Sequence, residues 1–282
     1  MRLATHFKEV LPTVILCAAL CFLGQAEVMA AAGGPRFSFH KGEKLTYEMD
    51  LHTLSHGGGI PGGRQDISGE AVLRVLNVET DGTAEIELLT RGKGRVTFGT
   101  ETIQPIEIKQ GEPSHIVLIV KPDGSIAQFR DTGGNPTAAV MRPGFNMLNG
   151  GDVVQAYIVG TYTLFGLLLP SRLPAREGKW TGYRKEEFSS LPNMSHVQLK
   201  KVPATYTFTG AREYKGRNRV VISGSVPNVG MENGLPTRFY FDSAKGQLVG
   251  REARVKRFGR QQADVEWITT LIKVEQVEFE GK

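Results

Sequence analysis

The histidines and glycines between residues 52 and 59 are the residues whose type and spacing come closest to known chemistry. His52 and His56 are four positions apart, a spacing that lets two imidazoles bind one metal ion when both lie on a helix. Three glycines follow His56, and such a turn can offer backbone N–H groups to an oxyanion. However, the sequence has no Gly-x-Ser-x-Gly turn, and a strand that ends at His52 would hold the two histidines apart. We therefore interpret this segment as a glycine-rich loop.

Two pairs of carboxylates alternate along expected strands, Glu85 with Glu87 and Asp264 with Glu266. Residues i and i+2 of a strand share a face and lie about 7 Å apart, which overlaps the carboxylate spacing of inverting glycosidases. The same alternation is typical of the solvated side of an antiparallel sheet, and no aromatic platform for a sugar accompanies either pair. The sequence therefore predicts a protein that is not an enzyme and that needs no metal or other cofactor.

A run of cations between residues 251 and 260 departs from an otherwise even charge distribution. The whole chain carries 34 Lys and Arg against 29 Asp and Glu, a formal net charge of +5. Two interpretations of the run stay open. It either contacts an anionic membrane surface or other phosphate groups, or it is the solvated face and turn of a strand, which is the simpler interpretation. The candidate contact residues are Arg251, Arg254, Lys256 and Arg257. Nucleic-acid binding is not expected.

Residues 1–30 have the three parts of a secretory signal peptide: a charged start, an apolar run and small residues at a cleavage site. Val28 and Ala30 fit cleavage after Ala30. The apolar run at residues 11–23 is shorter than the about 20 residues that a spanning helix needs. Both cysteines of the chain lie within it, so the mature protein is expected to contain no disulfide. We expect an exported protein, periplasmic or extracellular.

Alternation of apolar and polar residues dominates the mature chain, as residues 45–51 illustrate. This period of two predicts half-buried antiparallel strands. The Asp-Gly pairs at 81–82 and 123–124 are hairpin signals, and further turn candidates stand at 215–216, 233–234 and 245–246. The expected fold class is therefore mainly β.

The mature chain divides into two halves with a similar pattern, residues 31–135 and 175–282. A glycine precedes the first expected strand of each half, and the hairpin signals at 81–82 and 215–216 occur at nearly the same offset. This similarity suggests a duplicated antiparallel meander. Such a duplication predicts one or more curved sheets, arranged as a half-barrel or a sandwich.

Residues 136–174, between the halves, break the strand pattern and are expected to be an apolar helical connector. The stretch Val153 to Leu169 is uncharged, with Asp152 as a candidate N-cap and Pro170 as a stop. Such a helix would be apolar nearly all round and should be buried against a sheet. A pair of strands and a short membrane span are the alternatives. Candidate residues for lining an apolar ligand site are Tyr157, Tyr162 and Phe165.

The signal peptide, the Gly-x-x-Leu-x-Tyr opening at 42–47, the Leu-Pro-rich bridge before Trp180 and the hairpin at 241–248 occur together in this chain. This combination resembles uncharacterised secreted β-rich bacterial proteins. It is more distantly similar to periplasmic half-barrel carriers of lipids or lipoproteins, in which a curved sheet wraps around an apolar helical lid. We expect the prolines and glycine before Trp180 to form a rigid connector that places this side chain in the core of the second half.

The leading functional hypothesis is an exported, non-enzymatic protein of the envelope that binds an apolar small molecule, a lipid, or an apolar segment of a partner protein. The curved sheet, partly closed by residues 136–170, would hold this ligand. The alternative is an envelope scaffold or interaction protein without a ligand cavity, whose binding surface is a sheet edge or the basic strand around Arg254. A peripheral association with the membrane is compatible with both hypotheses.

Overall fold

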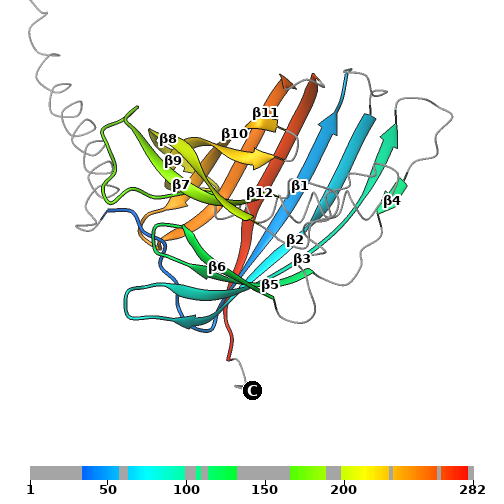
Figure 1. Cartoon of the computed structure of the whole chain (residues 1–282). Coiled ribbons are helices and arrows are strands. Elements are labelled where there is room, and N and C mark those ends of the chain that lie inside the picture. Colours follow the sequence, from blue (N-terminus) through cyan, green and yellow to red (C-terminus); the bar gives the residue numbers. More distant parts are fainter. Residues whose placement is uncertain are drawn as a thin grey trace, which may run out of the picture.

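The structure, a computed structural model of the 282-residue chain, describes residues 34–56, 63–98, 106–108, 114–131, 166–188, 198–228, 231–258 and 262–278. These residues form a single antiparallel sheet of 12 strands (Figure 1). The strands are β1 (Glu43–Leu54), β2 (Gly63–Val78), β3 (Ala84–Phe98), β4 (Ile106–Ile108), β5 (Ser114–Val120), β6 (Ile126–Asp131), β7 (Lys179–Phe188), β8 (Gln198–Tyr214), β9 (Arg217–Asn228), β10 (Met231–Asp242), β11 (Gln247–Phe258) and β12 (Ala263–Gln276).

The strand order along the sheet is β6-β5-β3-β2-β1-β12-β11-β10-β9-β8-β7, and β4 pairs with β3 beside this path. Strands β1–β6 lie within residues 31–135 and strands β7–β12 within 175–282. In each half neighbours in sequence pair with one another, except that β5 pairs with β3 and not with β4. The halves join where β1 pairs along its whole length with β12. The prediction of a mainly β, antiparallel and curved sheet is confirmed, whereas the duplication stays a prediction.

Glycine turns account for four of the hairpins, as the sequence predicts. Gly82, Gly124, Gly216 and Gly246 all have positive φ, from 63° to 85°, which few side-chain-bearing residues adopt. The prediction of a turn at residues 233–234 is wrong. These residues lie within β10, where the register with β9 shifts between Met231 and Leu235. The connection from β9 to β10 lies between Asn228 and Met231 instead.

The sheet has one apolar and one polar face, because directly opposed residues of antiparallel strands point to the same side. On β1, Leu45, Tyr47 and Met49 are buried, whereas Glu48 is exposed. The same alternation continues on the neighbouring strands in matching register. Members of the apolar face on nine strands are Ile86, Leu73, Met49, Trp267, Ala253, Phe239, Ile222, Tyr206 and Trp180.

A strap at residues 166–173 shows which way the sheet curves. Leu169 donates its backbone N–H to the carbonyl of Asp123 (2.8 Å), in the turn between β5 and β6. The indole of Trp180, on β7, donates to the carbonyl of Leu168 (2.9 Å). In a flat sheet, β5 and β7 would be about 43 Å apart, at about 4.8 Å for each step between strands. The sheet must therefore curve toward its apolar face, which is concave, as Figure 1 shows.

Gly166 to Leu169 are buried, but they are not helical. The expected apolar helix from Val153 to Leu169 therefore does not extend over its last four residues, and residues 153–165 lie outside the described residues. The backbone N–H of Leu169 and the carbonyl of Leu168 bond to other elements instead of to a helical turn.

An amino-terminal segment, residues 34–42, closes one end of the concave face. Phe37 donates its backbone N–H to the carbonyl of Pro122 (2.7 Å), and Ser38 donates to that of Gly246 (2.9 Å). The Phe37 ring meets the Phe241 ring edge-on at 5.3 Å between centroids. This closed end of the concave face is tightly packed, since the depression next to Tyr47 has room for about one water molecule.

Candidate functional site

The concave apolar face of the sheet is the candidate site. One row of directly opposed residues crosses this face on six successive strands, from β1 through β12, β11, β10 and β9 to β8. It consists of Met49, Thr269, Arg251, Phe239, Ile222 and Phe208, and each is 6% exposed or less. Arg251 is thus a charged residue in a row of otherwise uncharged side chains.

Arg251 is held in place by an aromatic ring and a hydroxyl. Its guanidinium carbon lies 4.3 Å from the ring centroid of Trp267, a cation–π geometry. Its Nε donates to the Thr269 hydroxyl at 3.2 Å. Trp267 is 3% exposed, and its indole Nε1 is buried without a hydrogen-bond partner among the residues that the structure describes. The concave face therefore combines a large apolar area with a compact group of hydrogen-bond donors.

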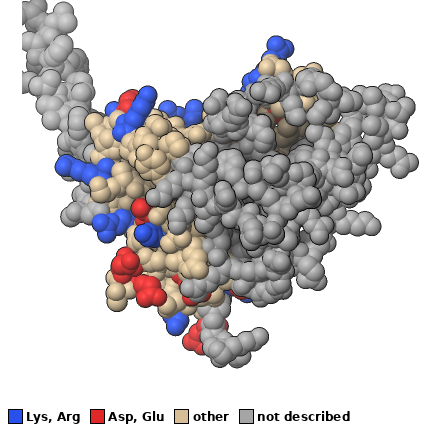
Figure 2. Space-filling model, in the orientation of Figure 1, with Lys and Arg blue, Asp and Glu red and all other residues tan. Residues whose placement is uncertain are grey.

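The structure separates the four cations that the sequence grouped as one surface. Arg251 lies on the concave face at 2% exposure and shares no surface with the other three, whose contact with an anionic surface stays a prediction. Arg254 lies on the polar face and forms an ion pair with Glu266 at 3.0 Å. Lys256 and Arg257 are exposed. In the view of Figure 2, the Lys and Arg side chains of the described residues form separate groups with other surface between them.

The predicted lining residues Tyr157, Tyr162 and Phe165 lie outside the described residues. Trp180 lies where the sequence analysis expected it, partly buried against the core and stacked on Tyr206 at 5.5 Å between centroids. Tyr206 in turn donates its hydroxyl to the carbonyl of Gly166. The strap is therefore anchored to both β7 and β8. Within the described ranges there is no helix that could cross a bilayer.

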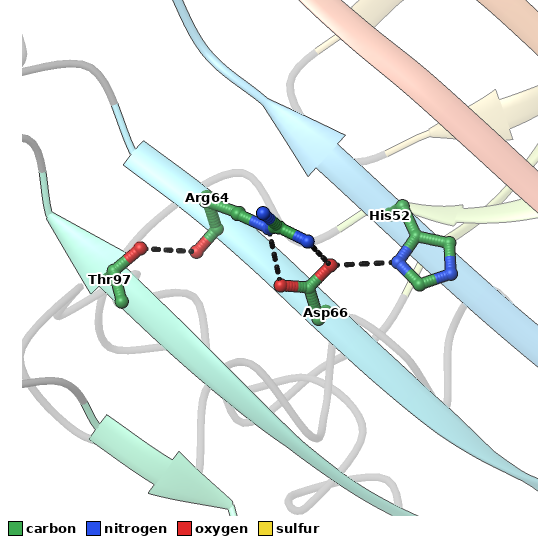
Figure 3. A network of polar contacts seen from close by, with 4 residues as sticks. All are labelled: His52, Arg64, Asp66 and Thr97. Carbon is green, nitrogen blue, oxygen red and sulfur yellow. Dashed lines mark hydrogen bonds and ion pairs between the residues drawn. The ribbon is translucent and has the colours of Figure 1, made fainter.

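A network on the polar face joins β1, β2 and β3 (Figure 3). His52 Nδ1 lies 2.8 Å from Asp66 Oδ1, and Arg64 Nε donates to the other oxygen of Asp66 at 2.6 Å. The hydrogen bond from Arg64, and to a smaller extent the one with His52, holds the pKa of Asp66 below its usual range. Thr97 donates to the backbone carbonyl of Arg64, not to the imidazole (Figure 3). A His–Asp pair can serve as a general base, but this one faces solvent beside a guanidinium, and the Thr97 hydroxyl of the network is bonded to a backbone carbonyl and not to the imidazole.

His52 and His56 bind different carboxylates, so their spacing in the sequence does not bring them to a common metal ion. His56 Nε2 lies 3.1 Å from Asp264 Oδ2 on β12, on the other side of β1 from Asp66. Among the described residues, no group of three or more His, Cys, Asp or Glu side chains is arranged to hold a metal ion. Glu87 pairs with Arg74 across β2 and β3 at 3.1 Å, as on an ordinary solvated sheet face.

Several polar groups of the structure were not singled out from the sequence. Arg219 and Asp242 form a largely buried ion pair at 2.9 Å. Tyr214 stacks on Tyr240 at 3.9 Å between centroids. Burial, and to a smaller extent the hydrogen bond that Tyr240 donates to Glu252, raises the pKa of Tyr240 to about 12. For Arg251 a signal was present: it alternates in phase with Ala253 and Val255, whereas Arg254 and Lys256 have the opposite phase. The ion pair joins two hairpins and has no such local signal.

No family model and no curated protein matches this sequence. Among solved structures, a lipovitellin studied for its lipid–protein interactions is 12% identical with a TM-score of 0.45, over 87% of this chain and 26% of that one. This chain therefore spans about a quarter of the lipovitellin chain. A β-barrel-like protein from Brucella abortus, of the domain of unknown function DUF1849, is 10% identical with a TM-score of 0.29, over 84% and 98% of the two chains. A Bacteroides fragilis protein with a YmcC-like fold is 9% identical with a TM-score of 0.28, over 86% and 99%.

Proposed function

We propose that this chain is an exported, non-enzymatic protein that binds an apolar molecule of the lipid class on the concave face of its sheet. The observation that carries the proposal is the continuous apolar face, which runs over the strands from β5 to β7 and curves toward the strap. Burial of apolar surface contributes about 25 cal/mol for each Å² removed from water. A curved sheet offers an acyl chain contact on several sides at once, which a flat surface cannot.

The side chains of this face are buried, and the depression next to Tyr47 is too small for a lipid. Lipid binding is therefore expected to change the packing over the concave face. The signal-peptide pattern of residues 1–30 supports the proposed export, which would bring the protein into contact with membrane lipids.

The direct test is to express the chain from Ala31, purify it without detergent and identify co-purifying apolar molecules by mass spectrometry. We expect a lipid at a stoichiometric amount. Two leucines of β1 on opposite faces provide matched variants: Leu51 on the apolar side, and Leu54 on the polar side, 44% exposed. Leu51→Lys should lose the lipid, and Leu54→Lys should keep it.

An empty, stable and monodisperse wild-type protein would refute the proposal and would favour the envelope scaffold instead. Equal loss of lipid in both leucine variants would show that the lipid is bound elsewhere than on the concave face. Far-UV circular dichroism of each variant, which reports the β-sheet content, separates loss of the ligand from loss of the fold.

A further inference from the structure

The group formed by Arg251, Trp267 and Thr269 gives the concave face a polar point near its middle. Arg251 lies on β11 between two opposed neighbours of the same row, Thr269 on β12 and Phe239 on β10. All four side chains are 3% exposed or less. Three strands, β10, β9 and β8, lie between β11 and the edge strand β7, so the group lies well inside the sheet.

Two features of this group suit a ligand with anionic oxygen atoms. The indole Nε1 of Trp267 is a buried donor with no acceptor in the described ranges, and leaving such a donor unsatisfied costs about 1–3 kcal/mol. The Arg251 guanidinium, held against the same indole at 4.3 Å, has N–H groups arranged in a plane that matches a carboxylate or phosphate. In an apolar surrounding of low dielectric, hydrogen bonds from the Trp267 indole and the Arg251 guanidinium to an anionic oxygen are stronger than they would be in water.

We propose that the ligand of the concave face is an amphiphile with an anionic head group, whose oxygen atoms bind Arg251 and the indole N–H of Trp267 while its acyl chain lies along the apolar rows. This inference rests on the proposed function, because it names the class of lipid. Phe239 is opposite Arg251 on the next strand and Met49 lies two strands away in the same row, so both offer apolar contact along the chain of the ligand. A carboxylate and a phosphate share this chemistry, and the test distinguishes them.

The test compares three ligands with the same chain: dodecanoate, dodecyl phosphate and the uncharged dodecan-1-ol. Binding is followed by calorimetry and by the emission of Trp267 in a Trp180→Phe background, since the chain has only these two tryptophans. We expect at least one anion to bind about 10- to 100-fold more tightly than the alcohol, as a charge-assisted hydrogen bond gives. A preference for dodecanoate or for dodecyl phosphate identifies the head group.

Arg251→Met keeps the length of the side chain and removes its charge, so it should abolish the preference for the anion while changing the affinity for the alcohol less than about threefold. Trp267→Phe keeps a ring but removes the N–H donor, and it should reduce the preference in part. Arg254→Met, on the polar face of the same strand, is the matched control and should leave the preference unchanged.

Equal affinity of the wild type for the alcohol and both anions would overturn the inference and leave the proposed function standing. Binding of none of the three ligands would refute the proposed function itself. A preference that persists in Arg251→Met would show that another group binds the head. The wild-type comparison needs no variant, so the inference can be refuted even when Arg251→Met does not fold.

Discussion

Trp180 holds the strap against the second half of the sheet, and Trp180→Ala should therefore lower the free energy of unfolding of the protein. The indole stacks on Tyr206 and donates to the carbonyl of Leu168 at 2.9 Å. Truncation of a core tryptophan costs about 3–5 kcal/mol, and the lower end applies here because Trp180 is only partly buried. Loss of the hydrogen bond adds about 1 kcal/mol, so the expected decrease in the free energy of unfolding is about 3–4 kcal/mol. Urea unfolding followed by circular dichroism measures it.

Two further variants separate the contributions. Trp180→Phe keeps an aromatic ring on Tyr206 and removes the N–H donor, so it should cost only about 1–2 kcal/mol. Tyr183→Ala, on the same strand at 64% exposure, should stay within about 0.5 kcal/mol of the wild type. If Trp180→Ala were no more destabilising than Tyr183→Ala, the contacts of Trp180 with the strap and with Tyr206 would not contribute to stability, and the reasoning would be refuted.

Three other changes test the packing of the second half. Arg219→Met leaves the Asp242 carboxylate buried without its ion pair, and it should lower the free energy of unfolding by about 3 kcal/mol in a denaturant titration. Gly246→Ala should lower the free energy of unfolding by about 2 kcal/mol or more, because φ is positive and a Cβ would lie 2.6 Å from Ser38 of the amino-terminal segment. Gly216→Ala is the control: its φ is also positive but the space around it is open, so it should cost only about 1 kcal/mol. The folded state raises the pKa of the Tyr240 phenol to about 12, whereas the unfolded chain loses this proton near pH 10, so Tyr240 should contribute up to about 2 kcal/mol to a fall in stability across that window. Tyr240→Phe should reduce this fall without abolishing it, because burial also raises the pKa of Tyr47 and of Tyr214.

Much of the fold could be predicted because it depends on local signals. The period of two follows from the pleat, and the turns at Gly82, Gly124, Gly216 and Gly246 follow from a backbone conformation that glycine adopts easily. The strap was predicted less well. An uncharged run that ends at a proline is typical of a buried helix, but at Leu168 and Leu169 hydrogen bonds to Trp180 and to the turn at Asp123 replace helical ones. Those partners come from elements distant in sequence, so no local pattern contains them.

The candidate site, like the fold, could be predicted from the sequence only where a local pattern indicates it. The sequence grouped Arg251 with Arg254 because both belong to one run of cations, but adjacent strand positions point to opposite faces. Arg251 is two positions before Ala253 and four before Val255, and this alternation already indicates that it lies on the apolar face of the sheet. The stacking of Arg251 on Trp267 depends on the register of β11 with β12, which only the folded sheet defines.

The pairing of the first strand with the last has a consequence for the order in which this protein folds. Gln276 donates its side chain to the carbonyl of Lys41, a contact that spans 235 residues, and β12 fills the place between β1 and β11. Until β12 has been made, both meanders present a bare central edge and an uncovered apolar face, the features that slow folding and favour aggregation. A chain of this design stays incompletely folded until β12 is available, and the proposed export would benefit from this delay, because an incompletely folded chain can pass through a translocation channel.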